Sequence, residues 1–391
     1  MVEAIDDSGP PSLNVAHGVF PHSPWTLTPD GDAYGSVTEG LDFDPRLVWE
    51  DDLELVVRGQ IQHLLQLGQA DAAVGRLIDR LEETGQWEES LVVVVADHGA
   101  GFEPGGQHRE PSADNLDEVF RVPMFVKYPD QTEGVIDDQP AQTSDLVPTV
   151  VETLDAEVAW EFDGVPLSED RSERTPIAIL RDGSEITLDP SVEPLLELAR
   201  RNHDRFPHRD DWLGVVAVGQ HGVHVGEDVD DLDPDPGAGW SWSTDRATDF
   251  ERVEEGFVPI QFTGALSGPA GLDEPSVLLA VNGTVAGVGT QVTEGDEDGS
   301  WTFSTIVAPE LFELGSNDVE LLVEDPEDPD SFLLVPADGA ADWTVERDGD
   351  GRPESVRLGD EVLPVVADGD DEDRRLHVDD DRATVGERRV D

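Results

Sequence analysis

The chain has 391 residues, of which 89 are acidic and 24 are basic, and its formal net charge is −65. This charge disfavours nucleic-acid binding, because phosphate backbones are bound by basic patches. The chain has no cysteine, which excludes disulfide bonds, thiolate metal ligands and a cysteine nucleophile. The acidic residues are spread over segments that we expect to fold. We therefore interpret the charge as a halophilic adaptation to concentrated salt, the alternative being a surface that binds cations or basic partners.

Targeting signals are not evident in the sequence. No run of about 18 apolar residues is present, so we expect no membrane span. The first residues, MVEAIDDSGPPSL, have neither a basic start nor an apolar core, so they do not form a signal peptide. The location is therefore cytoplasmic by default, unless export and anchoring signals lie on another polypeptide.

The stretch LVVVVADHGAGFEPGGQHR, residues Leu91–Arg109, contains the most informative pattern. Leu91–Ala96 is a continuous apolar run, which favours a strand buried on both faces of a parallel sheet. In open α/β sheets, ligands bind beyond the carboxyl ends of the strands. Asp97 and His98 occupy that position, and a carboxylate beside an imidazole can form half of a divalent metal site.

The region before this stretch predicts a second strand end and a long helix. Leu13–Phe20 has the pattern of a strand and ends at a stiff proline-flanked turn that contains His22. His22 either occupies the same kind of strand-end position as Asp97 or caps a turn. An apolar seam of helical period predicts a helix over Asp52–Thr84, which Gly85 ends.

The rest of the chain divides by composition. We expect a strand within 122–128, a helix at 144–154 and a second helix at 190–203. From residue 214, short β-type runs alternate with turns, at 215–218, 258–266, 276–281, 301–307 and 319–323, and Asn282-Gly283 is a strong hairpin signal. We therefore expect an α/β region at 1–170, a mixed connection at 171–213, a β-sandwich-like domain at 214–325 and an acidic region at 326–391.

Several segments in order resemble the sulfatase-like branch of the alkaline phosphatase superfamily, which includes arylsulfatases and membrane-anchored phosphoglycerol transferases. They are HGVFPHSPW, PDGDAYG, QIQHLLQLGQADAAVGRLIDRLEETGQW, LVVVVADHG, QHRE, VFRVPMFVKYPDQ, TSDLVPTVVETL and FDGVPL. The resemblance covers roughly residues 12–170 and, loosely, 256–324. It implies a partial alkaline-phosphatase-like sandwich with a mostly parallel sheet, corresponding to the C-terminal half of the catalytic domain, followed by a smaller all-β domain.

The resemblance also implies roles for individual residues. Asp97 and His98 resemble two ligands of a divalent ion, whether Ca, Mg, Mn or Zn. His22 resembles the histidine that contacts the ester's oxyanion or leaving group, and His108 and Arg109 lie where the family has a further substrate-facing basic residue. The implied reaction is metal-dependent hydrolysis of a sulfuric or phosphoric ester, or phosphoglycerol-type transfer.

The sequence departs from the family pattern near its start. The family domain opens with a strand that carries acidic metal ligands, and a threonine, serine or formylglycine nucleophile follows. Asp6 and Asp7 instead precede a turn-forming Ser-Gly-Pro-Pro segment. We therefore expect a truncated catalytic domain without its nucleophile, whose other half is a separately encoded chain. The alternatives are an inactive remnant, or a surface module whose β domain binds a glycan or envelope polymer.

Overall fold

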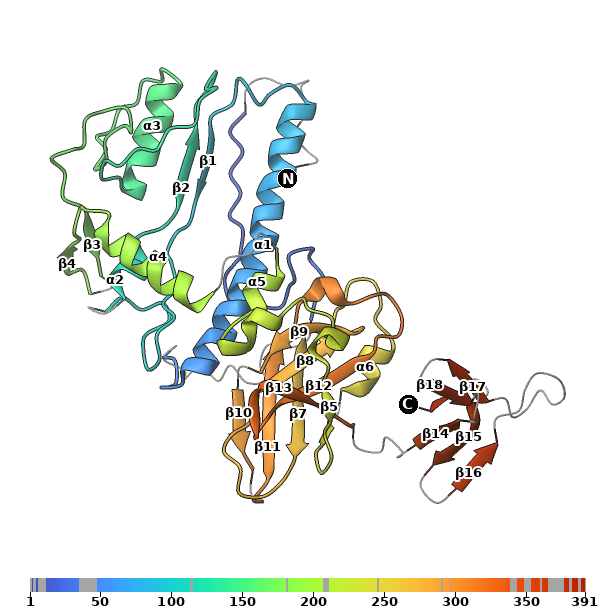
Figure 1. Cartoon of the computed structure of the whole chain (residues 1–391). Helices are drawn as coiled ribbons and strands as arrows, with labels where there is room; N and C mark the ends of the chain where they lie inside the picture. The colour runs from blue at the N-terminus through green and yellow to red at the C-terminus, as the bar shows by residue number, and fades with distance from the viewer. Residues whose placement is uncertain are drawn as a thin grey trace.

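The computed structural model describes residues 2, 5, 12–34, 48–112, 115–180, 182–206, 211–244, 246–289, 291–295 and 297–337, together with the backbone of short strands between 343 and 390. An α/β region is followed by an all-β region (Figure 1). The α/β fold class with a smaller all-β part is therefore confirmed. Asp6 and Asp7 lie outside the described residues.

The α/β region contains one long helix and two separate two-stranded sheets, β1-β2 and β3-β4. Its elements are α1 (Leu53–Glu83), β1 (Val92–Val95), α2 (Leu116–Phe120), β2 (Met124–Lys127), a 3-10 turn (Thr143–Asp145), α3 (Leu146–Thr153), β3 (Ile177–Ile179), β4 (Glu185–Thr187) and α4 (Glu193–Arg205). The predicted long helix is confirmed. It begins after Asp52, whose Oδ1 accepts hydrogen bonds from the N–H groups of Glu54 and Leu55 at 2.9 and 3.1 Å. The β1-β2 sheet lies between α3 and α1 (Figure 1).

The strands β1 and β2 pair antiparallel, with Val94 opposite Phe125. The parallel arrangement expected for this apolar run is therefore not found in this pair. The chain leaves β1 through the glycine-rich loop, whose described residues are 96–112. It returns through the single-turn helix α2 to the same end of the sheet. A parallel partner would need a longer crossover along the whole strand. The run is also less buried than expected, since Val92–Val94 are half-buried and Val95 is exposed.

Two predicted strands are wrong. Leu13–Phe20 forms no strand, and Leu13 and Val15 are 80% and 77% exposed. No described segment pairs with it, and an apolar alternation does not make a strand without a partner for its backbone groups. The run at 215–218 instead contributes to a short helix, because four apolar residues do not distinguish a strand from a buried helical turn.

The all-β region consists of two sheets whose inner faces share one core. Its elements are α5 (Leu213–Val216), 3-10 turns (Gln220–His224 and Val229–Leu232), β5 (Asp235–Pro236), β6 (Ser241–Ser243), α6 (Ala247–Glu251), β7 (Gln261–Ser267), β8 (Val277–Val281), β9 (Thr284–Val288), β10 (Gln291–Glu294), β11 (Ser300–Ile306), a 3-10 turn (Pro309–Leu311), β12 (Val319–Asp325) and β13 (Asp328–Val335). The sheet orders are β10-β11-β7-β6 and β5-β13-β12-β8-β9. The other four predicted runs correspond to β7, β8, β11 and β12.

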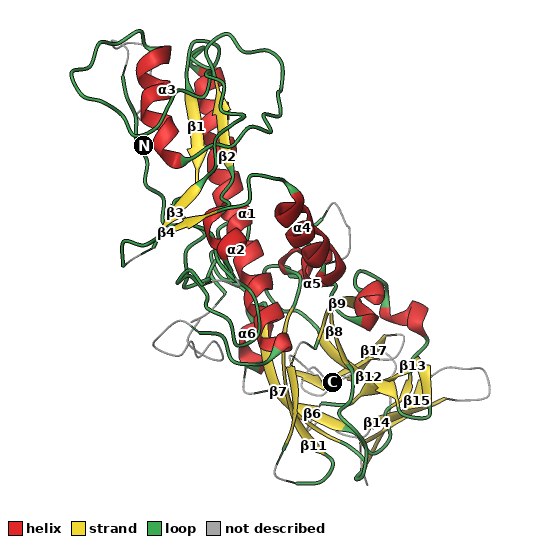
Figure 2. Ribbon diagram, turned by 90° about the vertical axis from the view of Figure 1, so that its left-hand side faces the viewer, coloured by secondary structure: helices red, strands yellow, loops and turns green. Residues whose placement is uncertain are grey.

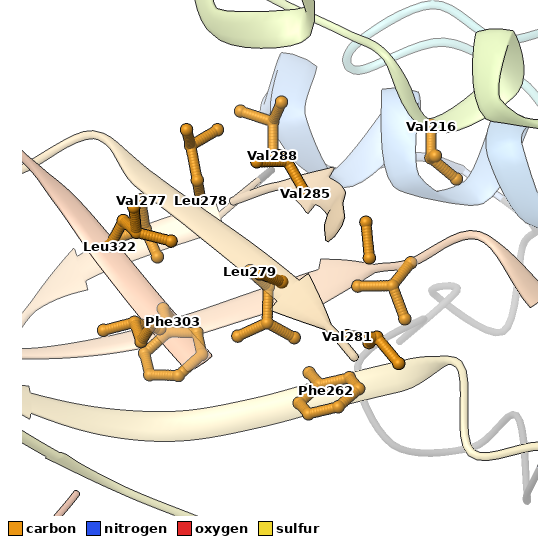
Figure 3. Close-up of a cluster of buried hydrophobic side chains, with 14 of the residues drawn as sticks. Val216, Phe262, Val277, Leu278, Leu279, Val281, Val285, Val288, Phe303 and Leu322 are labelled. Carbon is orange, nitrogen blue, oxygen red and sulfur yellow. The ribbon is translucent and has the colours of Figure 1, made fainter. Parts of the chain in front are cut away.

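The hairpin between β8 and β9 is confirmed. Asn282 and Gly283 have φ angles of 51° and 78°, and two consecutive positive values are required by the tight turn that suits twisted strands. The strand β8 is buried along its whole length. Figure 3 shows Leu279 and Val281 of this strand among the core side chains, with Phe262 of the opposite sheet.

The helix α1 belongs to both regions. Ile61 and Leu65 are fully buried in the same hydrophobic cluster as the sandwich core. Arg58 is also buried, and its Nη1 donates to Oγ of Ser304 in β11 at 2.5 Å. Figures 1 and 2 both show α1 extending from the sandwich along the α/β region. The sandwich therefore supports the helix on which the α/β loops are built.

The C-terminal strands form two small antiparallel sheets. They are β14 (Trp343–Arg347), β15 (Pro353–Leu358) and β16 (Glu361–Pro364) in one sheet, and β17 (Leu376–Asp379), β18 (Arg382–Val385) and β19 (Arg388–Val390) in the other.

Candidate active site

The Asp97-His98-Gly99 turn follows β1 after one residue, Ala96, so it lies at the carboxyl end of the strand as predicted. Oδ1 of Asp97 accepts a hydrogen bond from the backbone N–H of His98 at 2.9 Å. Gly99 is required by a close approach to α2, since an added Cβ would lie 1.9 Å from the backbone oxygen of Glu118. Its N–H donates to the backbone oxygen of Val119 at 2.8 Å. The contact with α2 therefore fixes how the chain leaves the sheet at His98.

His22 lies in a proline-flanked turn that α1 holds in place. Gln66 of α1 is 1% exposed, and its Nε2 donates to the backbone oxygen of His22 at 2.8 Å. Oε1 of the same amide accepts from the backbone N–H of Thr26 at 2.9 Å. Nε1 of Trp25 donates to the backbone oxygen of Pro21 at 2.9 Å. The backbone of the turn is therefore fixed, while the side chain of His22 remains exposed.

An aromatic cluster packs behind this turn. We define it as Trp25, Trp49, His63, Phe102 and His108, whose contacting ring centroids lie 5.2 to 6.4 Å apart. Its members come from the His22 turn, the segment before α1, α1 itself and the glycine-rich loop. The cluster therefore joins the elements that carry the predicted site residues.

Burial determines the protonation of the two histidines in the aromatic cluster. Desolvation lowers the pKa of His63 to about 4 and that of His108 to about 4, because the charged imidazolium loses its hydration. Both rings are therefore neutral at pH 7. His108 is only 4% exposed, and its Nδ1 lies 3.4 Å from the backbone oxygen of Gly101.

Arg109 lies next to His108 but points to the opposite side, where it joins two histidines. Its Nη1 lies 2.8 Å from Nε2 of His22, and its Nη2 lies 3.2 Å from Nε2 of His98. The His22 turn and two distant positions of the glycine-rich loop, His98 and Arg109, thus meet through one guanidinium group.

The contacts with Arg109 define the tautomer of both histidines. Arginine has five N–H donors and no acceptor, so Nε2 of each ring must accept and carries no proton. Nδ1 of His98 then donates to the backbone oxygen of Gly99 at 2.8 Å, and Nδ1 of His22 donates to the backbone oxygen of Ser23. In this arrangement Nε2 of each ring faces Arg109 and the candidate site.

The structure therefore brings four of the five predicted site residues together. His22, His98 and Arg109 are in direct contact, and Oδ2 of Asp97 lies 4.0 Å from Nε2 of His98 with its side chain 77% exposed. His108 lies on the buried side of the same loop, in the aromatic cluster. The chemical roles assigned to all five residues stay predictions.

Two groups of residues that position the site were not found from the sequence. The first is Gln66, although its neighbour Gln62 lies four residues earlier on the buried face, and two amides at this spacing on an apolar helix face would have indicated a polar contact. The second is a pair of arginines on α4. Arg201 contacts Oε1 of Glu103 at 2.9 Å and Oε1 of Glu118 at 2.5 Å.

Arg205 completes the contact between α4 and the glycine-rich loop. Its Nη1 donates to Oε1 of Gln60 at 2.6 Å and to the backbone oxygen of Phe102 at 3.1 Å. None of the residues of α4 is buried, so polar contacts hold this helix in place. Burial raises the pKa of Glu118, and the positive charges of Arg201 and Arg205 oppose this rise.

The donor atoms at the strand end suit a divalent ion but do not complete a site. Asp97 supplies an exposed carboxylate and His98 supplies an imidazole with an unprotonated Nε2, which are both ligand types that such ions accept. Among the residues that the structure describes, no group of three acidic or histidine side chains could hold a metal ion. The fit is therefore to two ligands of a larger set.

The comparisons with known proteins agree on one family. Residues 11–156 match the family model "Sulfatase". The ulvan-active sulfatase of Formosa agariphila is 29% identical over 174 residues, which are 43% of this chain and 32% of that protein. The multifunctional alkaline phosphatase superfamily protein PehA of Trinickia caryophylli is 32% identical over 96 residues, which are 24% of this chain and 18% of that protein.

A third relative is the lipoteichoic acid synthase-like protein YvgJ of Bacillus subtilis, 34% identical over 134 residues. The match covers 30% of this chain and 21% of that protein. The chain thus spans less than a third of the length of these curated relatives. In the described part of the chain, every helix is too short or too polar to cross a lipid bilayer. The segment 11–156 belongs to the sulfatase-like branch of the alkaline phosphatase superfamily.

Proposed function

We propose that the segment 11–156 forms one half of a metal-dependent site for anionic sulfuric or phosphoric esters, acting in ester hydrolysis or in phosphoglycerol-type transfer. The observation that carries the proposal is the contact of Arg109 with both His22 and His98 at the carboxyl end of β1. The similarity to an ulvan-active sulfatase and to a lipoteichoic acid synthase-like protein supports this class of ester.

Each of the five residues has a proposed role that follows from the chemistry of its side chain. Asp97 and His98 would hold the divalent ion, which could be Ca, Mg, Mn or Zn, and the bound ion would supply stabilisation of charge on the ester oxygens. Arg109 would bind the same anionic group through its planar pair of N–H donors. His22, released from Arg109, would face the leaving-group oxygen and hold the proton that the departing alcohol needs. His108 would act indirectly, by fixing the loop that carries Arg109.

We further propose that the nucleophile and the remaining ligands come from protein outside the matched segment. Two ligands hold a metal more weakly than the three or four of complete catalytic sites, and the relatives are much longer than the matched part. The sheet leaves room for further strands, since in the described part of the chain β1 and β2 pair only with each other and each has a free outer edge. A separately encoded half is one source of these strands.

The test is ester turnover by the purified chain, alone and after co-expression with the neighbouring upstream reading frame. We expect metal-dependent hydrolysis of p-nitrophenyl sulfate or of a p-nitrophenyl phosphate diester in the combined preparation. Arg109→Met should lower kcat/KM by roughly a hundredfold or more, since a charged contact to a transferring group is lost in the transition state. The matched control is Arg200→Met, an exposed arginine on α4.

Two results would contradict the proposed function. One is the absence of turnover with either ester class and each of the four metals in every combination. The other is unchanged turnover in Arg109→Met, which would place the reaction elsewhere in the preparation.

A further inference from the structure

We propose that Arg205 of α4 is a positioning residue for Arg109, and that docking of α4 on the glycine-rich loop sets the affinity of the candidate site for oxyanions. The inference rests on the proposed function for the role of Arg109 as an anion ligand. It adds regulation of that role by a helix that lies outside the matched segment 11–156.

The first step is that Arg205 joins the middle of the glycine-rich loop to the long helix. Its Nη1 donates to Oε1 of Gln60 at 2.6 Å and to the backbone oxygen of Phe102 at 3.1 Å. Gln60 is 6% exposed, and its Nε2 donates to Oδ1 of Asn202 on α4 at 3.2 Å. Because α1 is anchored in the sandwich core, Arg205 holds the loop against a fixed element.

The second step is that α2 and α4 together hold the other polar group of the Phe102 backbone. Its N–H donates to the carboxylate of Glu118 on α2. Oε1 of that carboxylate lies 2.5 Å from Nη2 of Arg201, and Nη1 of Arg201 lies 2.9 Å from Oε1 of Glu103 in the loop. The N–H and the carbonyl of Phe102 therefore both depend on arginines of α4.

The third step is that the position of Phe102 determines that of Arg109. The residue before Phe102 is Gly101, whose N–H donates to the backbone oxygen of His108 at 2.7 Å. The ring of His108 also packs against that of Phe102, with centroids 5.8 Å apart. A shift of Phe102 is therefore passed to His108 and to the next residue, Arg109, whose Nη1 lies 2.8 Å from Nε2 of His22.

The fourth step is that α4 can leave the loop without unfolding the core. None of its residues is buried, and Leu195 and Leu196 are 46% and 43% exposed. Segments with little buried apolar surface open locally at a lower free energy than the core does. An oxyanion bound by Arg109 should therefore stabilise α4 docking, and docking should favour the anion, because coupling between two sites is reciprocal.

The experiment is hydrogen–deuterium exchange of the full chain, measured by mass spectrometry for the loop at 96–112 and for α4. The probe is inorganic sulfate, titrated in KCl at constant ionic strength so that screening of the net charge of −65 does not change. Arg205→Met is compared with wild type and with Arg200→Met, which alters an exposed arginine of the same helix. Arg109→Met reports the general effect of sulfate on exchange, which is subtracted.

A second control separates positioning from a loss of stability. Arg174 contacts both carboxylate oxygens of Asp145 at 2.7 Å, and the side chain of Asp145 is 0% exposed. Arg174→Met therefore removes a buried charge contact from the same region, away from the contacts that join α4 to the loop.

The expected result follows from the coupling between α4 and the loop. In wild type, Arg200→Met and Arg174→Met, sulfate should slow exchange in the loop and in α4 with the same half-maximal concentration. In Arg205→Met, that concentration should rise roughly threefold or more for the loop, because the contact that couples the two elements is missing. Protection of α4 by sulfate should be lost in the same variant.

The inference would be overturned by a sulfate response in Arg205→Met that equals the wild-type response. It would also be overturned if Arg174→Met lost the response as fully as Arg205→Met, since the effect would then be one of general stability. A wild-type response no larger than that of Arg109→Met would reject the anion-binding role of Arg109 and this inference with it. Absence of ester turnover with intact coupling would instead reject only the proposed function.

Discussion

At the scale of single residues, the four histidines in and around the candidate site differ in solvent access. His22 is exposed and accepts from a guanidinium, and His98 does the same with a half-exposed ring. His63 and His108 are enclosed by aromatic rings, and burial keeps them neutral. The exposed pair is suited to ligand chemistry, and the buried pair holds the loops together.

The buried pair should make the fold sensitive to acid. The folded-state pKa of about 4 lies below the value of 6.5 for a free histidine, so the unfolded chain binds more protons between these limits. Stability is therefore fully present above pH 6.5 and is lost as the pH falls toward 4, by roughly 3 kcal/mol for each histidine at most. Urea unfolding of wild type and of His63→Phe/His108→Phe at pH 7 and pH 5 measures this contribution.

The double variant should lose less stability than wild type between the two pH values, because phenylalanine keeps the ring contacts and cannot be protonated. Since acidic residues titrate in both proteins, the difference between the two curves is the relevant quantity. Parallel curves would show that the aromatic cluster does not exclude the charged form.

At the scale of elements, α4 is the clearest case of a helix held by charge. Arg201 and Arg205 contact the glycine-rich loop and α2, whereas the leucines of α4 remain partly exposed. The helix follows the matched family segment in the chain, yet it contacts the loop that carries Arg109. The position of that loop therefore depends on a part of the chain outside the family match.

Removing one arginine from α4 should leave a buried carboxylate without its partner. Arg201→Met should lower the free energy of unfolding by about 2 kcal/mol, because the side chain of Glu118 is only 9% exposed. Arg201→Met/Glu118→Gln should recover most of the loss. The control Arg200→Met should cost less than about 0.5 kcal/mol, since its ion pair with Glu193 is exposed. Chemical denaturation measures all four proteins, and equal losses in the single and double variants would contradict this account.

The sequence predicts elements well where one local signal dominates. The seam of α1 and the Asn282-Gly283 turn each contain the physical cause of the structure, and both are found. The strand predicted at Leu13–Phe20 is wrong because a strand needs a pairing partner that its own residues do not specify. The parallel pairing predicted for β1 is wrong for a similar reason. The connection between two strands determines their pairing direction, and the residues of the strand do not.

The sequence predicts which residues belong to the candidate site, but it does not predict the contacts between them. The places of His22, Asp97 and His98 after apolar runs indicate a site, and the family resemblance adds Arg109. The contacts between these residues depend on Gln66 and on the aromatic cluster, which join segments forty or more residues apart in the sequence. The burial of His108 was not predictable, because its neighbours in the sequence are polar.

At the scale of the whole molecule, charge dominates the behaviour in solution. A net charge of −65 on 391 residues repels itself at low ionic strength and is screened within about 3 Å at 1 M salt. We therefore expect the unfolding midpoint to rise steadily as KCl increases from 0.2 to 3 M. Differential scanning calorimetry measures this midpoint, and sucrose of equal osmolality is the control for excluded-solute effects. A midpoint that is highest at low salt would contradict the halophilic interpretation.

The shared use of α1 has a practical consequence for dissecting this protein. Because Ile61 and Leu65 complete the interior of the sandwich, a gene fragment that encodes only residues 214–325 would leave that apolar surface open to water. The same cut would deprive the His22 turn of the helix that carries Gln66. Any assay of carbohydrate recognition by the β-rich part should therefore retain the long helix, so that a negative answer reflects recognition rather than an excised half of one core.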